Sequence, residues 1–582
     1  MPLPSFAGTL GPKRAAHLLH RASFGPTKGQ IDSFSLFTAS QAVSQLFIAS
    51  LPAPLPPIDP KTGKEWALSY NADANTSDGD LQEFFKGWFL AQMLSTGVPA
   101  GQSLSYSVRE KIVFFMHTIL TTIQSKVDNS RSLYFQNQLF RKFAFDKTAG
   151  VKFSFKELSK KICVDNAMLR LLDGNLNVKG NPNENYAREF HELYTIGRGL
   201  EGSLPPVTDP GDYFLYKELD VQTAAKVLSG WDIDTTFSNI DADTLLPRGK
   251  VRGSTNNASS HDNSVKQFSD RFLNSSITPN PILLSGANPT EASALDEISQ
   301  LVEQIYSKQE TAMNICRRVY RHYVYHDITP ALDSAVIIAM ADTFKNSGYK
   351  IQAVLEDLFQ SQHFFDAAGG VEDDNFGGII KSPLDIMVGT MRFFEKTVPD
   401  PQTAASQLYE KTSVLIGNLT AMGMHFYDPF DVAGYDAYHQ YPIYHRSWIS
   451  TNFLTNRYDF IRKLVSDNQM TAEKIDVVNF VKTKISNSIA SDAKSLIIEL
   501  AKYLLPLNDN LTYNTALDDT SGLTAERMNY FLTAFLKAPQ IDADPEGSWT
   551  FRWTHPVDPE VVTRQLENLF NAMMQSPEYQ LF

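Results

Sequence analysis

Signals for the start of a helix recur along the chain, and they constrain its fold more than any other feature of the sequence. A serine followed three positions later by a glutamate is typical of a first helical turn, because each side chain satisfies a backbone N–H group of that turn. Ser107 with Glu110 shows this pattern, and so does Ser154 with Glu157, whose predicted helix extends toward Leu172. We therefore expect capped helices at both places.

Proline and apolar periodicity extend this prediction over most of the chain. Ser382–Pro383 and Asp558–Pro559 each combine a cap residue with a first-turn proline, the position where proline is best tolerated in a helix. Apolar residues with helical spacing cover residues 290–308, 310–325, 331–347, 351–363, 403–423, 445–466, 472–486, 490–505 and 524–537. Alternating polar and apolar runs are scarce. The sequence thus predicts a mainly α protein, a multi-helical single body with long loops and little β structure.

Three loop segments and the absence of flexible linkers bear on domain organisation. Residues 51–64, 199–216 and 232–260 are rich in proline or in small polar residues, which is typical of surface loops. No Gly/Ser linker interrupts the chain, so we expect one helical domain over residues 1–582. The alternative that residues 470–582 form a more loosely packed helical part stays open.

A short pattern occurs twice, each time after an amphipathic helix. Residues 360–364 read QSQHF and residues 575–579 read QSPEY. Either the pattern marks two structurally similar halves of the chain, or it is a coincidence.

Composition excludes several classes of protein. Lysine and arginine number 52 against 65 aspartates and glutamates, which gives a formal charge of −13 and argues against a nucleic-acid-binding protein. The two cysteines, Cys163 and Cys316, are too few for a disulfide framework or a thiolate metal site. No apolar run approaches the roughly 20 residues that span a bilayer, so we expect no membrane span.

The N-terminal residues bear on localisation. Lys13 and Arg14 interrupt any apolar region almost at once, which is unlike a secretory signal. As written, the sequence predicts a cytoplasmic protein, or else a processed or non-classically exported chain.

The most informative segment lies between Gly180 and Gly197, and it reads GNPNENYAREFHELYTIG. This segment resembles the signature of the bacterial family called domain of unknown function 1800, above all in its residues 183–189. The features that follow in that family are also present in order: Tyr216, Glu218, Asp220, Val221, Ala224, Ala225 and Gly230–Trp231. Further matches are residues 17–27, His261–Asp262 with Lys266, residues 381–383, Arg392 and Trp448, so the resemblance covers nearly the whole chain.

The resemblance implies a partner rather than an established chemistry. Members of the family often accompany a sulfatase-like or alkaline-phosphatase-like protein in bacterial genomes, and many look like exported or surface proteins. Members also commonly carry two histidines two positions apart on an early helix. Here His117 is present but Ile119 occupies the second position. Because isoleucine cannot bind a metal, we expect no metal ion at His117.

The signature segment also holds the candidate site. On a helix, Asn185, Glu189 and Glu192 recur at i, i+4 and i+7 and so share one face. Arg188 lies four residues from both Glu184 and Glu192. A functional interpretation makes Glu189, Glu192 and Asp220 catalytic carboxylates, since like charges in a buried place raise a pKa and supply a general acid. It assigns binding roles to Asn185, Arg188, Glu184, Trp231, His261 and Asp262.

Two other interpretations of the same segment stay open. In the first, Arg188 neutralises the glutamates within a buried network that only stabilises the fold. In the second, the helix is a charged face exposed to solvent. His322 and His326, four residues apart, could meet one metal ion, but the tyrosines around them favour packing.

Two functions therefore compete. The first is a non-catalytic accessory or assembly protein that works with a sulfatase-like partner, and the absence of the second histidine favours it. The alternative is a hydrolytic or metal-assisted enzyme that uses the carboxylates of the helix over residues 183–197. In either case we expect Glu189 to be more critical than either neighbouring glutamate, Glu184 or Glu192, because it lies at the centre of the shared face.

Overall fold

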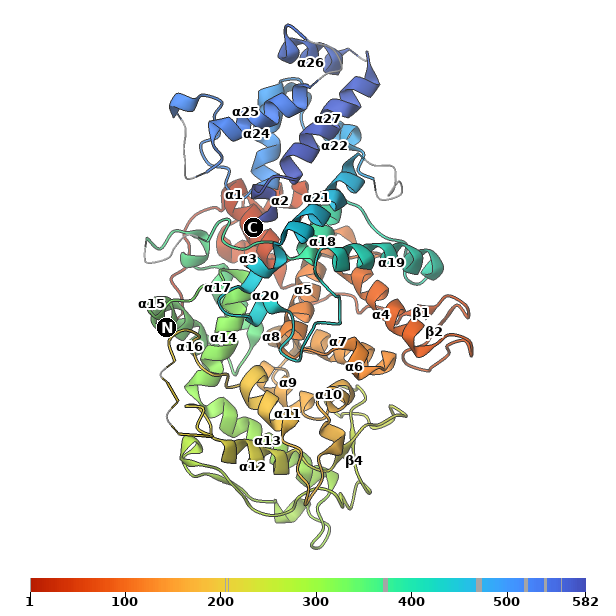
Figure 1. Cartoon of the computed structure of the whole chain (residues 1–582), viewed down its shortest axis with the longest axis vertical. Helices are drawn as coiled ribbons and strands as arrows, with labels where there is room; N and C mark the ends of the chain where they lie inside the picture. The colour runs from red at the N-terminus through yellow and green to blue at the C-terminus, as the bar shows by residue number, and fades with distance from the viewer. Residues whose placement is uncertain are drawn as a thin grey trace.

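Helices dominate the regular structure of the described chain (Figure 1). The computed structural model describes residues 2–582 except residues 205, 208, 370–374, 467–473, 518–521, 538–541 and 556. The described residues form one mainly α-helical body, which confirms the fold class predicted from the sequence.

The helices follow one another along the chain. The first ten are α1 (Gly11–Ala22), α2 (Lys28–Phe34), α3 (Ala39–Leu46), α4 (Asp78–Met93), α5 (Ser103–Ile119), α6 (Gln124–Val127), α7 (Ser130–Ala144), α8 (Asp146–Ala149), α9 (Phe155–Ile162) and α10 (Asn166–Leu171). The next eight are α11 (Asn185–Glu189), α12 (Glu218–Val227), α13 (Glu291–Ser307), α14 (Gln309–Tyr323), α15 (Pro330–Leu332), α16 (Ile338–Asn346), α17 (Ile351–Phe359) and α18 (Pro383–Phe393). The last nine are α19 (Ala405–Ala421), α20 (Asp436–His439), α21 (Thr451–Val465), α22 (Val477–Lys484), α23 (Asn487–Ala490), α24 (Ala493–Leu504), α25 (Ala525–Leu536), α26 (Pro545–Thr554) and α27 (Pro559–Met574). Long breaks lie between α3 and α4, between Tyr194 and α12, and between α12 and α13.

Shorter elements fill the connections. Two are π-helices, η3 (Phe190–Tyr194) and η6 (Asp333–Ile337). The 3-10 turns include η7 (His363–Phe365), η8 (Tyr444–Trp448) and η10 (Glu578–Gln580). The strands form three antiparallel pairs of two residues each: β1 (Ile58–Asp59) with β2 (Lys64–Glu65), β3 (Trp231–Asp232) with β4 (Lys250–Val251), and β5 (Lys266–Gln267) with β6 (Ser276–Ile277).

The predicted caps have mixed outcomes. The Ser154 hydroxyl accepts a hydrogen bond from the Glu157 N–H at 3.2 Å, and α9 starts after it as expected, although it ends at Ile162. The Ser382 cap is likewise present, at 3.1 Å from the Asp385 N–H. The capping box predicted at Ser107 is wrong, because α5 begins four residues earlier. The Ser107 hydroxyl instead accepts a hydrogen bond from the N–H of Phe24, just after the end of α1.

The molecule is elongated, with the C-terminal helices at one end (Figure 1). There α27 packs against α21, α22 and α25, while α12 and α13 lie at the opposite end. Helix α24 contacts α1, and Tyr503 on α24 donates a 2.6 Å hydrogen bond to Asp32 of α2. The C-terminal helices are thereby joined to the N-terminal ones.

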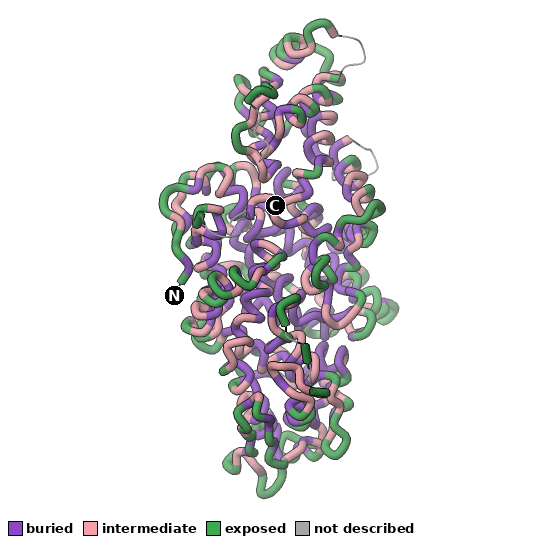
Figure 2. Tube along the Cα trace, turned by 60° about the vertical axis from the view of Figure 1, so that its left-hand side comes forward, coloured by how far each residue is buried: buried purple, intermediate pink, exposed green. Residues whose placement is uncertain are grey.

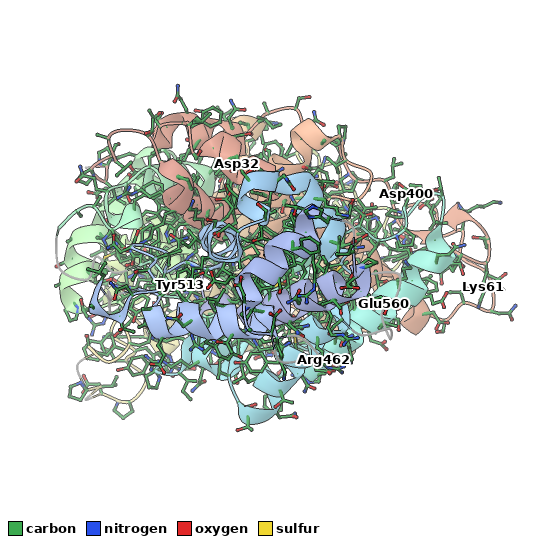
Figure 3. All side chains as sticks on the ribbon, turned by 90° about the horizontal axis from the view of Figure 1, so that it is seen from above. Asp32, Lys61, Asp400, Arg462, Tyr513 and Glu560 are labelled. Carbon is green, nitrogen blue, oxygen red and sulfur yellow. The ribbon has the colours of Figure 1, made fainter. Side chains whose placement is uncertain are left out.

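Buried backbone runs through the middle of the body (Figure 2), where α5 is buried along nearly its whole length. Exposed charged groups lie at the periphery: Lys61, in the turn between β1 and β2, is at the outer edge when the molecule is seen from above (Figure 3). In the described part of the chain, no helix is both long enough and apolar enough to cross a bilayer.

The two copies of the short sequence pattern adopt the same local arrangement. After α17 the Ser361 hydroxyl accepts from the Phe364 N–H at 3.1 Å, and after α27 the Ser576 hydroxyl accepts from the Tyr579 N–H at 3.3 Å. Each turn then forms an antiparallel bridge, Ser5 with Ser361 and Ile380 with Leu581. Each bridged segment leads into a helix with proline in its first turn, α1 or α18.

Candidate functional site

The signature segment forms a short α-helix that continues as a π-helix. Helix α11 covers Asn185–Glu189, and the π-helix η3 covers Phe190–Tyr194. In a π-helix each backbone bond spans five residues rather than four, so side chains after Glu189 are rotated away from their α-helical positions. The continuous α-helix expected over residues 183–197 is therefore much shorter, and single π-turns of this kind are frequent at functional sites.

Glu189 is the carboxylate without a partner at this junction. Its side chain is half-buried, and among the described residues it accepts no hydrogen bond and joins no ion pair. Partial burial and then the negative charge of Glu192 raise the pKa of Glu189 to about 7. A carboxyl group with this pKa exchanges its proton near neutral pH.

Three further polar groups form an electrostatic chain that starts at Glu189: its charge acts on Tyr194, Arg318 acts on Tyr194 as well, and Arg318 acts on His439. The Tyr194 hydroxyl is buried without a hydrogen bond among the described residues, and burial followed by the Glu189 charge raises its pKa. Arg318 on α14 makes no hydrogen bond or ion pair with described residues, and burial lowers its pKa. His439 on α20 has a pKa lowered by burial and then by Arg318. Charges and a buried hydroxyl thus gather from three elements.

Arg188 belongs to a separate ion-pair network. Its guanidinium lies 2.5 Å from Glu218 and 3.3 Å from Glu184, and it also donates to the Tyr213 hydroxyl at 3.3 Å. Hydrogen bonding from Arg188 lowers the pKa of Glu218 to about 2. The stabilising network that the sequence suggested therefore holds Glu184 and leaves Glu189 out.

The other two predicted catalytic carboxylates have partners. Glu192 pairs with Arg198 at 2.6 Å and accepts a 3.4 Å hydrogen bond from Tyr216. Asp220 is fully buried and accepts three hydrogen bonds of 2.7 Å, from the Lys217 N–H and from the N–H and hydroxyl of Ser269. Asp220 thus connects the start of α12 to the segment that follows β5, and both of its oxygens are occupied.

Two further predicted binding residues, the exposed Asn185 and the buried Trp231, contact only nearby protein groups among the described residues. The Asn185 side chain donates to the Leu172 carbonyl at 3.4 Å. Trp231 is fully buried in β3, opposite Val251 of β4, with the Arg248 guanidinium 5.9 Å from its ring.

His261 and Asp262 lie in a second cluster. The His261 ring is fully buried, with Nδ1 2.9 Å from the Ser229 carbonyl and Nε2 3.3 Å from a Glu297 oxygen. Lys266 also pairs with Glu297, and all three side chains are sealed from solvent. Asp262 instead accepts from the Ser264 N–H and hydroxyl at 2.8 and 2.6 Å. His261 and Asp262, both predicted as binding residues, therefore belong to different hydrogen-bonded groups.

Sequence reasoning missed Glu297 and Arg318. For Glu297 a signal was present, because it lies three residues after Ala294 and four before Leu301, on the apolar face of α13. An acidic residue at such a position needs a buried cation, and Lys266 supplies it. Arg318 gave no comparable signal. It carries the same charge as Arg317 beside it, and which of the two arginines forms ion pairs depends on residues elsewhere in the chain.

His117 and three further histidines, His322, His326 and His445, have pKa values lowered by burial. His117 stacks on Tyr427 with ring centroids 4.1 Å apart, neither ring nitrogen has a partner among the described residues, and burial lowers its pKa to about 3. His326 faces His445 at 2.8 Å, while His322 packs on Phe115. No group of three or more metal-ligating side chains occurs in the described part of the chain. That His117 holds no metal stays a prediction.

A hollow of about 950 Å³ opens between α22, α26 and α27. Its lining includes Trp553, Arg552 and Glu567, and none of the predicted site residues. Size alone would place a site there. We place the candidate site at Glu189 instead, because a carboxyl group whose pKa is raised to about 7 and which has no partner among the described residues is typical of functional sites.

Comparison with known proteins places the chain in a family. A family model described as a protein of unknown function, DUF1800, matches residues 17–581. The comparison with curated proteins gave no match, and the comparison with solved structures gave none either. The matched region extends from α1 to the last turn of the chain and includes the signature segment that forms α11 and η3. The chain therefore belongs to the DUF1800 family.

Proposed function

We propose that the chain is an accessory or assembly protein that binds a sulfatase-like partner, and that Glu189 takes part in recognising it. One observation carries the proposal: of the three predicted catalytic carboxylates, only Glu189 has no hydrogen-bond or ion-pair partner among the described residues. Hydrolysis needs several cooperating groups, such as a nucleophile with its base or a bound metal. A single available carboxyl group suffices for recognition.

The surroundings of Glu189 support a binding role. An unsatisfied buried polar group costs about 1–3 kcal/mol, and this cost is removed when a ligand supplies the missing hydrogen bond. Among the described residues the buried Tyr194 hydroxyl is such a group, and an incoming polar group would supply its missing bond. The half-buried Glu189 carboxyl would bond to the same incoming group. Because its pKa is about 7, Glu189 can accept a hydrogen bond when ionised and donate one when protonated.

The test measures association with a purified sulfatase-like protein of the kind that accompanies family members in bacterial genomes. Wild type, Glu189→Gln and Glu184→Gln are compared by sedimentation velocity and biolayer interferometry. We expect Glu189→Gln to weaken binding about tenfold, the effect of one lost polar contact of ~1.4 kcal/mol. Glu184→Gln, on the exposed network, should change Kd less than about twofold. Absence of a wild-type complex, or equal loss in both variants, contradicts the proposal.

A second candidate function rests on the pKa of Glu189. A carboxyl group whose pKa is about 7, and whose charge acts on the Tyr194 hydroxyl, resembles a general acid or base, and Arg318, which acts on the same hydroxyl, would stabilise an anion. This favours the hydrolytic or metal-assisted alternative.

Its test is a panel of carboxylic, phosphate and sulfate esters, assayed with and without divalent cations. Turnover that Glu189→Gln abolishes, and that Glu184→Gln preserves, would replace the accessory role with the enzymatic one. Equal background rates for wild type and Glu189→Gln would remove the alternative.

A further inference from the structure

We propose that residues 425–438, the docking segment, form the surface that binds the partner, with Phe430 as an apolar anchor and a basic segment of the partner lying along its aspartates. This inference rests on the proposed accessory function and specifies its interface. The docking segment connects α19 to α20 and lies beside the Glu189 site.

Phe430 is the first observation. Its side chain is 96% exposed, the highest exposure of any aromatic residue in the described chain, whereas the neighbouring Phe426 and Tyr427 are buried. Aromatic side chains are enriched at the centres of protein interfaces, where they provide a large and stiff contact area. An isolated exposed phenylalanine at the tip of a loop is placed to fill a pocket on a second protein.

The segment that presents Phe430 is held firmly at its base. Asp428 accepts hydrogen bonds from the N–H and hydroxyl of Ser125, at 3.0 and 2.7 Å. The Tyr427 carbonyl accepts from the Gln124 N–H at 2.8 Å, and Asp431 and Gly434 form a bridge beyond the tip. A rigid anchor loses little conformational entropy on binding, which favours affinity.

Charge indicates the chemistry of the partner. The docking segment contains Asp428, Asp431 and Asp436 and no lysine or arginine. A row of aspartates beside an exposed phenylalanine complements a segment that carries lysine or arginine next to an apolar pocket, because complementary potentials guide association and fix its register.

Asp431 joins the docking segment to the Glu189 site. Its negative charge is among the causes that raise the pKa of Glu189, and it acts on His439 as well. Phe430 is the neighbour of Asp431 in the chain, so its backbone lies about 3.8 Å away along the chain. A partner seated on Phe430 would therefore lie next to a residue whose charge acts on Glu189.

The test compares Phe430→Ala with Phe551→Ala, a matched control whose ring is 54% exposed on α26 at the far end of the molecule. Neither truncation removes core packing, so both variants are expected to fold. Binding to the purified sulfatase-like protein is measured by interferometry. We expect Phe430→Ala to weaken binding at least tenfold and Phe551→Ala to leave it unchanged.

Two further measurements test the charge and the location. Asp431→Asn with Asp436→Asn should slow association several-fold and reduce its dependence on salt, as expected for rim charges. On complex formation, backbone amides of residues 425–438 should become protected from hydrogen exchange.

The outcomes separate this inference from the proposed function. A complex that forms equally well with Phe430→Ala, or that protects other residues, overturns the docking surface while the accessory function stands. Absence of any wild-type complex overturns both. Self-association of the chain alone that Phe430→Ala abolishes would assign the surface to a second copy and also overturn the inference.

Discussion

Glu189 and Glu297 are two carboxylates that differ in burial and in whether they have ion-pair partners. Glu297, on α13, is fully buried between Lys266 and His261. Glu189, at the junction of α11 and η3, is half-buried and has no partner among the described residues. Lys266 lies on β5, so the Glu297 cluster connects a strand to a helix.

The difference separates carboxylates that maintain the fold from one that is available for binding. Removing one charge of a buried pair leaves the other without a counter-charge, and the loss of stability is large. A charge that is partly desolvated without a partner destabilises the folded state instead, and such charges persist where function requires them. The following predictions test this contrast, beginning with the largest expected effect.

Lys266→Met should destabilise the protein most. It leaves Glu297 buried without its cation, and breaking a buried pair typically costs roughly 3–5 kcal/mol. Urea denaturation followed by circular dichroism measures the change. Lys226→Met, on the exposed side of α12, is the matched control and should change the free energy of unfolding by less than ~0.5 kcal/mol. Similar values for both would mean that Glu297 is not held by Lys266.

Gly230→Ala should destabilise the same cluster by straining the backbone next to His261. Gly230 has φ +84°, and a Cβ there would lie 2.5 Å from the His261 backbone nitrogen. Strain of this kind costs about 1–3 kcal/mol. The control is Gly417→Ala in α19, where nothing lies within 4 Å and alanine should be neutral or stabilising. A Gly230→Ala protein as stable as wild type would contradict the close packing of His261 on Gly230.

Glu189→Gln should change the free energy of unfolding in the opposite direction and stabilise the protein at alkaline pH. The folded-state pKa of Glu189, about 7, lies above its unfolded value, so the folded state binds more protons between roughly pH 4.5 and 7. The stability that protonated Glu189 contributes at low pH is therefore lost as pH rises through 7. Allowing for solvent screening, we expect Glu189→Gln to gain ~1–2 kcal/mol at pH 8.

The pH dependence supplies the check on this prediction. Thermal denaturation at pH 5 and pH 8 should show a difference between Glu189→Gln and wild type that shrinks toward pH 5. A Glu189→Gln protein that is less stable than wild type at pH 8 would place Glu189 with Glu297, as a carboxylate that maintains the fold.

Glu184→Gln should have the smallest effect. Its side chain is 33% exposed, and Arg188 retains its bond to Glu218 when Glu184 is neutralised. Surface ion pairs of this kind contribute roughly 0–1 kcal/mol, so the Tm should move by no more than a degree or two. A larger loss would show that the Arg188 network is coupled to the Glu189 site.

The sequence by itself determined the helical architecture and the position of the signature segment. Capping and apolar spacing act over three to seven residues, so Ser154 and Ser382 could be placed at helix starts without knowledge of the rest of the chain. At Ser107 the prediction was wrong, because its side chain makes a hydrogen bond to a residue that is distant in the sequence.

Only the tertiary structure decided which carboxylate stays without a partner. Glu189, Glu192 and Asp220 look alike in the sequence, but Tyr216 lies 24 positions from Glu192 and Ser269 lies 49 positions from Asp220. The change to a π-helix after Glu189 also has no periodic signature, because it shifts the backbone bonding by one residue over a single turn. Side-chain pairing is set by segments brought together in space, and local spacing carries no record of it.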